Sequence, residues 1–205
     1  MKWTAGLIRR HVMLLGEGVA FSTRDCLAYG KRAAVDQALR RMVKREEIIR
    51  LARGVFCKWS IGKMPTLLEV VETKARAFGR QVFIHGARAA YQLKLIKKQK
   101  AFPRFATLAQ TSSFKCGSRT ILLKRISLRD AQLGDSIAGL ALRAIRWLKR
   151  TRPIRPILEK LKRNLKKQDL QKLRESASLM PAWFSDLLFI KKMPTNLALL
   201  RSTDD

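Results

Sequence analysis

Acidic residues, histidines and cysteines are scarce in this chain. Of its 205 residues, 15 are Asp or Glu, two are histidines and three are cysteines. Two histidines, His11 and His85, are too few for a zinc finger and argue against most histidine-based catalysis. The cysteines Cys26, Cys57 and Cys116 are an odd number and lie far apart in the sequence. This pattern predicts neither a disulfide framework nor a clustered zinc site, and it favours a reduced, cytoplasmic setting.

Motifs for catalysis are missing as well. The sequence has no Gly-rich phosphate loop, no HExxH pattern and no paired-acid motif. The middle third of the chain contains only the acids Glu69 and Glu72, which argues against two-metal phosphoryl chemistry. Cys26, His85 and Asp130 could be considered as a nucleophile set, but nothing in the sequence brings them together. A buried Cys26 and a structural His85 are the simpler interpretation. We therefore expect no enzymatic activity, no cofactor and no metal.

Long apolar runs are also absent. The uninterrupted apolar segments are too short to span a bilayer, so we expect no membrane partner. Arg9 and Arg10 interrupt the N-terminal region, and the apolar stretch from Val12 to Leu15 is too short for the core of a secretory signal.

Positive charge is what the chain has in excess. It carries 44 Lys and Arg residues and a formal net charge of +29, while 47% of its residues are hydrophobic, enough for a packed core. The excess is spread over the whole chain, at +8 for residues 1–59, +12 for 60–128 and +9 for 129–205. Because such a surplus repels itself, we expect a negatively charged partner. Nucleic acid is the first candidate and an anionic membrane surface the second, and of the two we predict nucleic acid and no membrane partner.

The first sixty residues predict a winged helix-turn-helix. The apolar spacing and the turn residues indicate four kinds of element in order. They are a helix at 4–15, a short helix at 22–29 that begins with a capping box, a basic helix at 31–46, and two strands at 48–52 and 55–59 around Arg53-Gly54. The alternative is that residues 31–46 form an ordinary surface helix in a three-helix bundle.

The basic helix and the hairpin supply the candidate DNA-binding residues. Val35, Leu39, Met42 and Val43 form one inward stripe, and the opposite face is polar and basic. We expect this face to enter the major groove, the start of the short helix to touch the DNA backbone, and the hairpin to lie on phosphates or in the minor groove. The full set is Thr23, Arg24, Lys31, Arg32, Ala33, Asp36, Gln37, Arg40, Arg41, Lys44, Arg50, Arg53 and Lys58.

The rest of the chain predicts a second domain, which makes the fold class α+β. We expect a domain at 1–59, a linker at 60–65 and a domain at 66–205 with a small, mainly antiparallel sheet and several helices. Capping boxes at Thr66–Glu69 and Ser127–Asp130 begin two helices. The first is expected to run to Phe78 with that ring in its buried stripe, and the second to continue as one long helix to Leu148.

A lysine-rich segment follows the compact helix that we expect at 86–93. It is either a phosphate-binding loop or a solvated connection, and the sequence leaves both interpretations open. The residues of this possible second basic surface are Arg88, Lys94, Lys97, Lys98 and Lys100.

Several segments resemble the AbiEi-type antitoxin family. The stretch 21–56, with A-V-D-Q-A-L-R-R-M-V and I-R-L-A-R-G-V-F, is similar to the winged-helix start of that family. Further segments match its second domain in order and spacing, so the resemblance covers nearly the whole chain. These are P-T-L-L-E at 65–69, I-H-G-A-R-A-A at 84–90, R-T-I-L-L-K at 119–124, A-L-R-A-I-R-W-L at 141–148 and L-M-P-A-W-F at 179–184.

The resemblance implies the antitoxin of a type IV toxin–antitoxin pair that binds its own promoter as double-stranded DNA and represses its operon. Its partner would be a nucleotidyltransferase-like toxin, engaged directly or only counteracted. The family's DNA contacts carry over to the helix at 31–46 and the wing at 50–58. The chain departs from the family at 93–100, where a more basic and longer segment replaces the usual L-G-L-S-T-Q-x-P pattern.

Two other functions are compatible with the same residues. A basic RNA-binding or ribosome-associated protein would use residues 94–125 as its RNA-binding face. An interaction protein would grip an acidic partner with its second domain, 66–205. The sequence does not give the oligomeric state.

Overall fold

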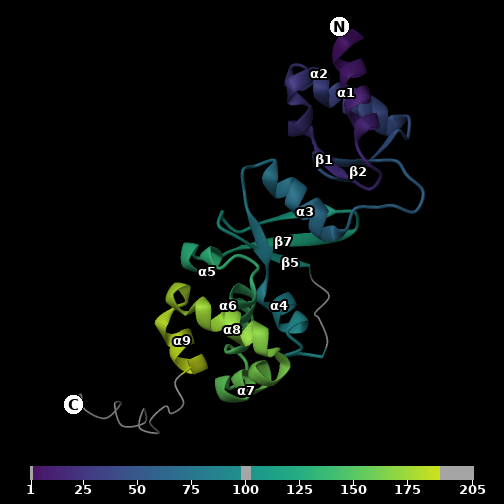
Figure 1. Ribbon diagram of the computed structural model, residues 1–205. Coiled ribbons are helices and arrows are strands. Elements are labelled where there is room, and N and C mark those ends of the chain that lie inside the picture. The colour runs from purple at the N-terminus through teal and green to yellow at the C-terminus, as the bar shows by residue number, and fades with distance from the viewer. Residues whose placement is uncertain (1, 98–102, 190–205) are drawn as a thin grey trace, which may run out of the picture. The chain divides into compact units, whose positions relative to one another are not determined.

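The computed structural model describes residues 2–97 and 103–189, and it is an α+β fold with a curled seven-stranded sheet and several helices (Figure 1). The chain divides into two compact units. The first contains Met1–Phe83 and Ala101–Ile126, and the second contains Ile84–Lys100 and Ser127–Asp205. The predicted linker at 60–65 lies inside the first unit, so these units divide the chain differently from the predicted domains 1–59 and 66–205.

The first unit begins with the elements that the periodicity predicted. In chain order they are α1 (Lys2–Leu14), β1 (Ala20–Ser22), the 3₁₀ helix η1 (Thr23–Tyr29), α2 (Arg32–Lys44), β2 (Ile48–Ala52) and β3 (Val55–Lys58). The inward stripe of α2 is buried with Ile8 and Val12 of α1 in one apolar cluster. The strands β2 and β3 form an antiparallel hairpin, and β1 pairs with the outer side of β3, with Phe21 opposite Phe56. Gly54 takes the left-handed conformation (φ 74°) that this tight turn requires.

The remainder of the first unit adds the other strands and one helix. These elements are α3 (Leu67–Arg76), β4 (Val82–Ile84), β5 (Arg104–Thr107), β6 (Ser112–Cys116) and β7 (Arg119–Arg125). Thr66 caps α3 as predicted, since its Oγ1 accepts from the Glu69 N–H while the Glu69 carboxylate accepts from the Thr66 N–H at 2.6 Å. Val71 of α3 is buried against Phe105, Ile121 and Leu123, so α3 covers this part of the sheet (Figure 1).

The sheet is larger and less regular than the sequence predicted. Its strand order is β1-β3-β2-β6-β7-β5-β4, and the N-terminal hairpin joins the later strands through the pairing of Ala52 with Cys116. The pair β6–β7 is antiparallel, but β5 lies on the far side of β7 and runs parallel to it, with Phe105 opposite Leu123. The expectation of a mainly antiparallel sheet missed this parallel pair, because strand order cannot be read from strand periodicity alone.

Two details of the helix predictions were wrong, namely the burial of Phe78 and the single long helix after Ser127. The helix α3 ends at Arg76, and Gly79 turns the chain at φ 65°, so Phe78 leaves the helical stripe and is 56% exposed. The predicted long helix is two helices, α5 (Leu128–Gln132) and α6 (Ile137–Leu148), with Gly134 at φ 52° between them. Ser136 caps the second helix through the Gly139 N–H at 3.2 Å.

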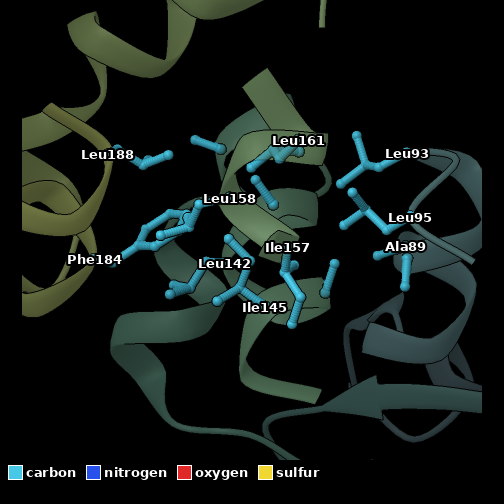
Figure 2. Packing of buried hydrophobic residues seen from close by; sticks show 14 of the residues in the cluster. Ala89, Leu93, Leu95, Leu142, Ile145, Ile157, Leu158, Leu161, Phe184 and Leu188 are labelled. Atoms are coloured by element: carbon cyan, nitrogen blue, oxygen red, sulfur yellow. The ribbon is translucent and has the colours of Figure 1, made fainter. Parts of the chain in front are cut away.

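The second unit is helical. Around α5 and α6 it contains α4 (Gly86–Gln92), α7 (Ile154–Asn164), α8 (Lys167–Glu175), a 3₁₀ turn η2 (Ala177–Leu179) and α9 (Ala182–Phe189). Its apolar core is the largest cluster of buried side chains in the described part of the chain. Figure 2 shows Leu142 and Ile145 of α6, Leu158 of α7 and Phe184 of α9 meeting in this core.

A buried arginine links α6 to the start of the second unit. Arg143 is 4% exposed, and its guanidinium donates to the carbonyl of Ile84 at 2.8 Å and to that of Gly134 at 2.8 Å, and it pairs with Asp135. One turn further along α6, Arg146 pairs with Asp130 at 2.5 Å. A buried charge is tolerated only when it is paired and hydrogen-bonded, and here carbonyls and two carboxylates meet that requirement.

Glycine makes the contact of α4 with α6 possible. A Cβ on Gly86 would lie 2.3 Å from the backbone oxygen of Arg143 and 2.6 Å from Cβ of Trp147. The glycine at the start of α4 therefore serves the close packing of these two helices.

The substitution Gly86→Ala is expected to destabilise the protein by about 1–3 kcal/mol, because the backbones of α4 and α6 must separate to admit a methyl group. The matched control is Gly6→Ala in α1, where a Cβ would meet nothing within 4 Å. That change is expected to stabilise by about 0.5–1 kcal/mol, since it improves helix propensity alone. Urea denaturation of both variants checks this, and equal effects in the two would refute the close-packing argument.

Candidate nucleic-acid interface

The first unit contains a cleft of about 1020 Å³ with a strongly cationic lining. Its walls come from η1, α2, the β2–β3 hairpin, the C-terminal end of α3 and β6. The basic side chains that line it are Arg24, Arg32, Arg40, Arg50, Arg53, Lys74, Arg80 and Lys115. Asp36 is the one acid among the described lining residues, and it is already paired with Arg32 at 2.9 Å. The cleft therefore has a large uncompensated positive charge.

The helix α2 presents two polar faces beside its buried stripe. Residues four apart share a helix face, which brings Arg32, Asp36 and Arg40 to the side that lines the cleft. Gln37 and Lys44 belong to the neighbouring face; both are exposed and neither lines the cleft. Arg40 lies between the two faces, so one helix can serve the cleft and the outer surface at once.

The hairpin turn is fixed by backbone contacts from two sides. The Thr23 N–H donates to the carbonyl of Gly54 at 3.0 Å, and the Lys74 ammonium donates to the carbonyl of Arg53. Burial lowers the pKa of Lys74, and the nearby Arg53 and Arg50 lower it further. The Lys74 ammonium thus lies among other cations and donates to a neutral carbonyl. An incoming anion would reduce the electrostatic repulsion at this position.

The structure exposes nearly all of the predicted DNA-binding residues. Asp36 and Lys58 are half-buried, whereas Thr23 is buried at 5% exposure, which leaves its side chain little surface for a phosphate. The cleft brings together Thr23, Arg24, Arg32, Asp36, Arg40, Arg50 and Arg53. The remaining predicted residues, Lys31, Ala33, Gln37, Arg41, Lys44 and Lys58, lie outside its lining.

The possible second basic surface belongs to the second unit. Arg88 is half-buried on α4, and Lys94 and Lys97 are exposed, while Lys98 and Lys100 lie outside the described residues. The segment is anchored, because Leu95 is buried in the core and the Asn164 side-chain amide donates to the carbonyls of residues 93 and 94.

Sequence reasoning missed one wall of the cleft. Lys74, Arg80 and Lys115 were not among the predicted site residues, and the ring of Phe78 was expected to be buried. Charged groups of Arg24, Lys74 and Arg80 lie 5.9, 5.2 and 5.7 Å from the centroid of the Phe78 ring. The sequence contains one local hint of this wall, the segment K-A-R-A-F-G-R at 74–80, with an aromatic residue among cations directly before a turn glycine. This segment does not indicate which other elements it meets.

The residues considered as a nucleophile set have structural roles. Cys26 is fully buried, and burial, with the charge of Asp25, raises the pKa of its thiol to about 11. Nδ1 of His85 accepts from the Ala87 N–H at 3.2 Å and so caps α4. Asp130 pairs with Arg146. In the described residues, no group of three His, Cys, Asp or Glu side chains could hold a metal ion, and no helix there combines the length and apolar character that crossing a membrane requires.

A family model matches most of the chain. Residues 8–173, most of the chain, match a family model that is described as a family of unknown function, DUF6088. No curated protein matches the chain.

The thiol of Cys26 is expected to resist alkylation in the native protein at neutral pH. A pKa near 11 in place of 9.0 leaves roughly a hundredfold smaller fraction of the reactive thiolate, and burial blocks access as well. Mass spectrometry after iodoacetamide treatment, with and without denaturant, measures this, and the half-buried Cys116 is the internal control. Native Cys26 alkylated as fast as the denatured thiol would contradict the structural role.

Proposed function

This chain belongs to the DUF6088 family, and we propose that it is a duplex-DNA-binding transcriptional regulator that represses its own operon. The proposal treats the elements from α1 to β3 as a winged helix-turn-helix, with α2 as the recognition helix and the β2–β3 hairpin as the wing. The observation that carries it is the cationic cleft that α2 and the hairpin line together, in which the one acid among the described lining residues is already paired.

The exposed face of α2 has side chains that can read bases. Gln37 can pair in bidentate fashion with adenine, and Arg40 can donate two hydrogen bonds to guanine in the major groove. Both side chains are exposed, together with Ala33, Arg41 and Lys44 on the same side of the helix. The rest of the first unit therefore does not cover this face, which a docked duplex requires.

The hairpin has the chemistry for phosphate contacts. Arg50 and Arg53 are exposed, and the turn between them is held by Thr23 and Lys74. A turn that is already fixed loses little conformational entropy when it meets a phosphate backbone, so its cations bind with less cost. Such contacts set affinity and salt dependence, whereas the α2 contacts set sequence preference.

The antitoxin role is a further part of the proposal. It rests on the resemblance of the sequence to AbiEi-type antitoxins, which implies a nucleotidyltransferase-like toxin as partner. A neighbouring gene for such a protein, with an inverted repeat in the shared promoter, would support it.

The substitutions Gln37→Ala and Arg40→Ala are expected to reduce the preference for the upstream region of the gene over a scrambled duplex by roughly 5- to 150-fold, the value of one bidentate base contact. Arg53→Ala is expected to weaken both duplexes alike and to reduce the log–log salt slope by about one unit. Fluorescence anisotropy at several salt concentrations measures both effects.

The matched control is Arg155→Ala, which removes an exposed arginine from α7 in the second unit. This variant should bind and discriminate like the wild type. If Gln37→Ala and Arg40→Ala also discriminate like the wild type, the groove assignment is wrong. Tighter binding of a structured RNA than of any duplex would favour the RNA-binding alternative instead.

A further inference from the structure

We propose that the cleft of the first unit binds an unpaired nucleotide segment, with one base stacked on Phe78 and the neighbouring phosphates held by the surrounding cations. The inference goes beyond the proposed function, because it concerns the α3 side of the cleft and does not require the groove contacts of α2.

The exposure of Phe78 is the first observation. A phenylalanine ring that is 56% exposed gives up most of the free energy that burial would provide, so its position requires an explanation. The ring does not belong to the core of α3, because the helix ends at Arg76 and Gly79 directs the chain away. It lines the cleft together with the half-buried ring of Phe114.

The charges around the ring are the second observation. Three cations from three separate segments lie within 6 Å of the Phe78 centroid: Arg24 of η1, Lys74 of α3 and Arg80 before β4. Lys74 also lies 5.8 Å from the centroid of Phe114. No carboxylate contributes to the lining on this side of the cleft, since the one lining acid, Asp36, belongs to α2.

This combination selects a nucleotide over other anions. An acidic peptide or a small phosphate would satisfy the cations but would leave the exposed ring without a partner. A nucleotide strand brings a planar aromatic base and a phosphate in each repeat, which matches an aromatic ring enclosed by cations. The cleft volume of about 1020 Å³ is at the upper end of the range for small-molecule sites, and eight basic side chains contribute to its lining.

An unpaired base is required for this contact. In a duplex the faces of the bases are covered by their neighbours, and only the edges face the grooves. A ring that lines a cleft can stack only on a base that has left the duplex or was never paired. Single-strand binding surfaces in general combine a cationic groove with such stacking rings.

The decisive substitution is Phe78→Leu, which keeps apolar volume and removes the flat π-face. Three probes of one sequence are compared by anisotropy: a blunt duplex, the same duplex with an unpaired tail, and the single strand. Phe78→Leu is expected to bind the tailed duplex and the single strand roughly 5- to 150-fold more weakly than the wild type does, which is the range for one stacked base. Binding of the blunt duplex should be unchanged.

A spectroscopic readout separates stacking from a general loss of affinity. With 2-aminopurine in the unpaired tail, wild type should quench the fluorescence, Phe78→Leu should not, and Phe78→Trp should restore the quenching. The matched control is Tyr91→Leu, which removes an exposed aromatic ring of the second unit and should change neither readout. Thermal denaturation of each variant establishes that it is folded.

Three outcomes would overturn the inference: equal binding of all probes by wild type and Phe78→Leu, an equal loss on all three probes, or polyglutamate displacing the tail in a manner independent of Phe78. DNA and RNA tails, tested in parallel, distinguish the two sources of an unpaired strand. If Gln37→Ala discriminates like the wild type while the Phe78 substitutions have the expected effects, the proposed groove contacts fail and this inference stands. If Gln37→Ala loses promoter preference while Phe78→Leu changes the binding of no probe, this inference fails and the proposed groove contacts remain.

Discussion

The mutual repulsion of cations in the first unit is the constraint on which the rest of the structure depends. Eight basic side chains line one cleft, and their single acidic neighbour is already paired. Since few carboxylates are available, neutral backbone carbonyls substitute for them, as the Lys74 ammonium on the carbonyl of Arg53 shows. Apolar burial then has to hold the walls together, and the packing of α2 on α1 and of α3 on the sheet does so. A fold built in this way leaves its charge for a ligand to neutralise.

The second unit treats the same problem differently. It buries an arginine, Arg143, but surrounds it with carbonyls and with Asp135, and it pairs Arg146 with Asp130. In this unit, carboxylates pair with the arginines that lie in or near the core, so the positive charge of those arginines is neutralised within the unit. This contrast separates a structural arginine from a ligand-binding one, because only a cation without an internal counter-charge gains by meeting an anion. On that criterion we propose the cleft, and not the Arg143 network, as the functional site.

Much of the local structure could be predicted from the sequence, and most of the errors concern long-range arrangement. Apolar periodicity located α2 and the hairpin, and the Thr66–Glu69 capping box located the start of α3. Two of the misses are local: Phe78 is exposed at the end of α3, where it was expected in the buried stripe, and Gly134 divided a predicted helix in two. The parallel pairing of β5 with β7 and the α3 wall of the cleft depend on which distant segments meet, and no local pattern encodes that choice. The α2 half of the candidate site was predictable because it is local, and the Phe78 half was not.

Lys74 connects the stability of the first unit to occupancy of its cleft. Its pKa in the folded protein is lowered by burial and by Arg53 and Arg50, so the native state binds this proton less tightly than the unfolded chain does. The cost of the charged form is therefore fully present below the folded pKa, and it disappears as pH rises through that value towards the ordinary lysine range. A polyanion in the cleft raises the folded pKa and removes the cost at neutral pH. A ligand that binds only the folded state also stabilises it by mass action. Under the proposed function, cleft binding and folding of the first unit are linked through this ammonium group, and filling of the cleft by a polyanion is expected to stabilise the fold.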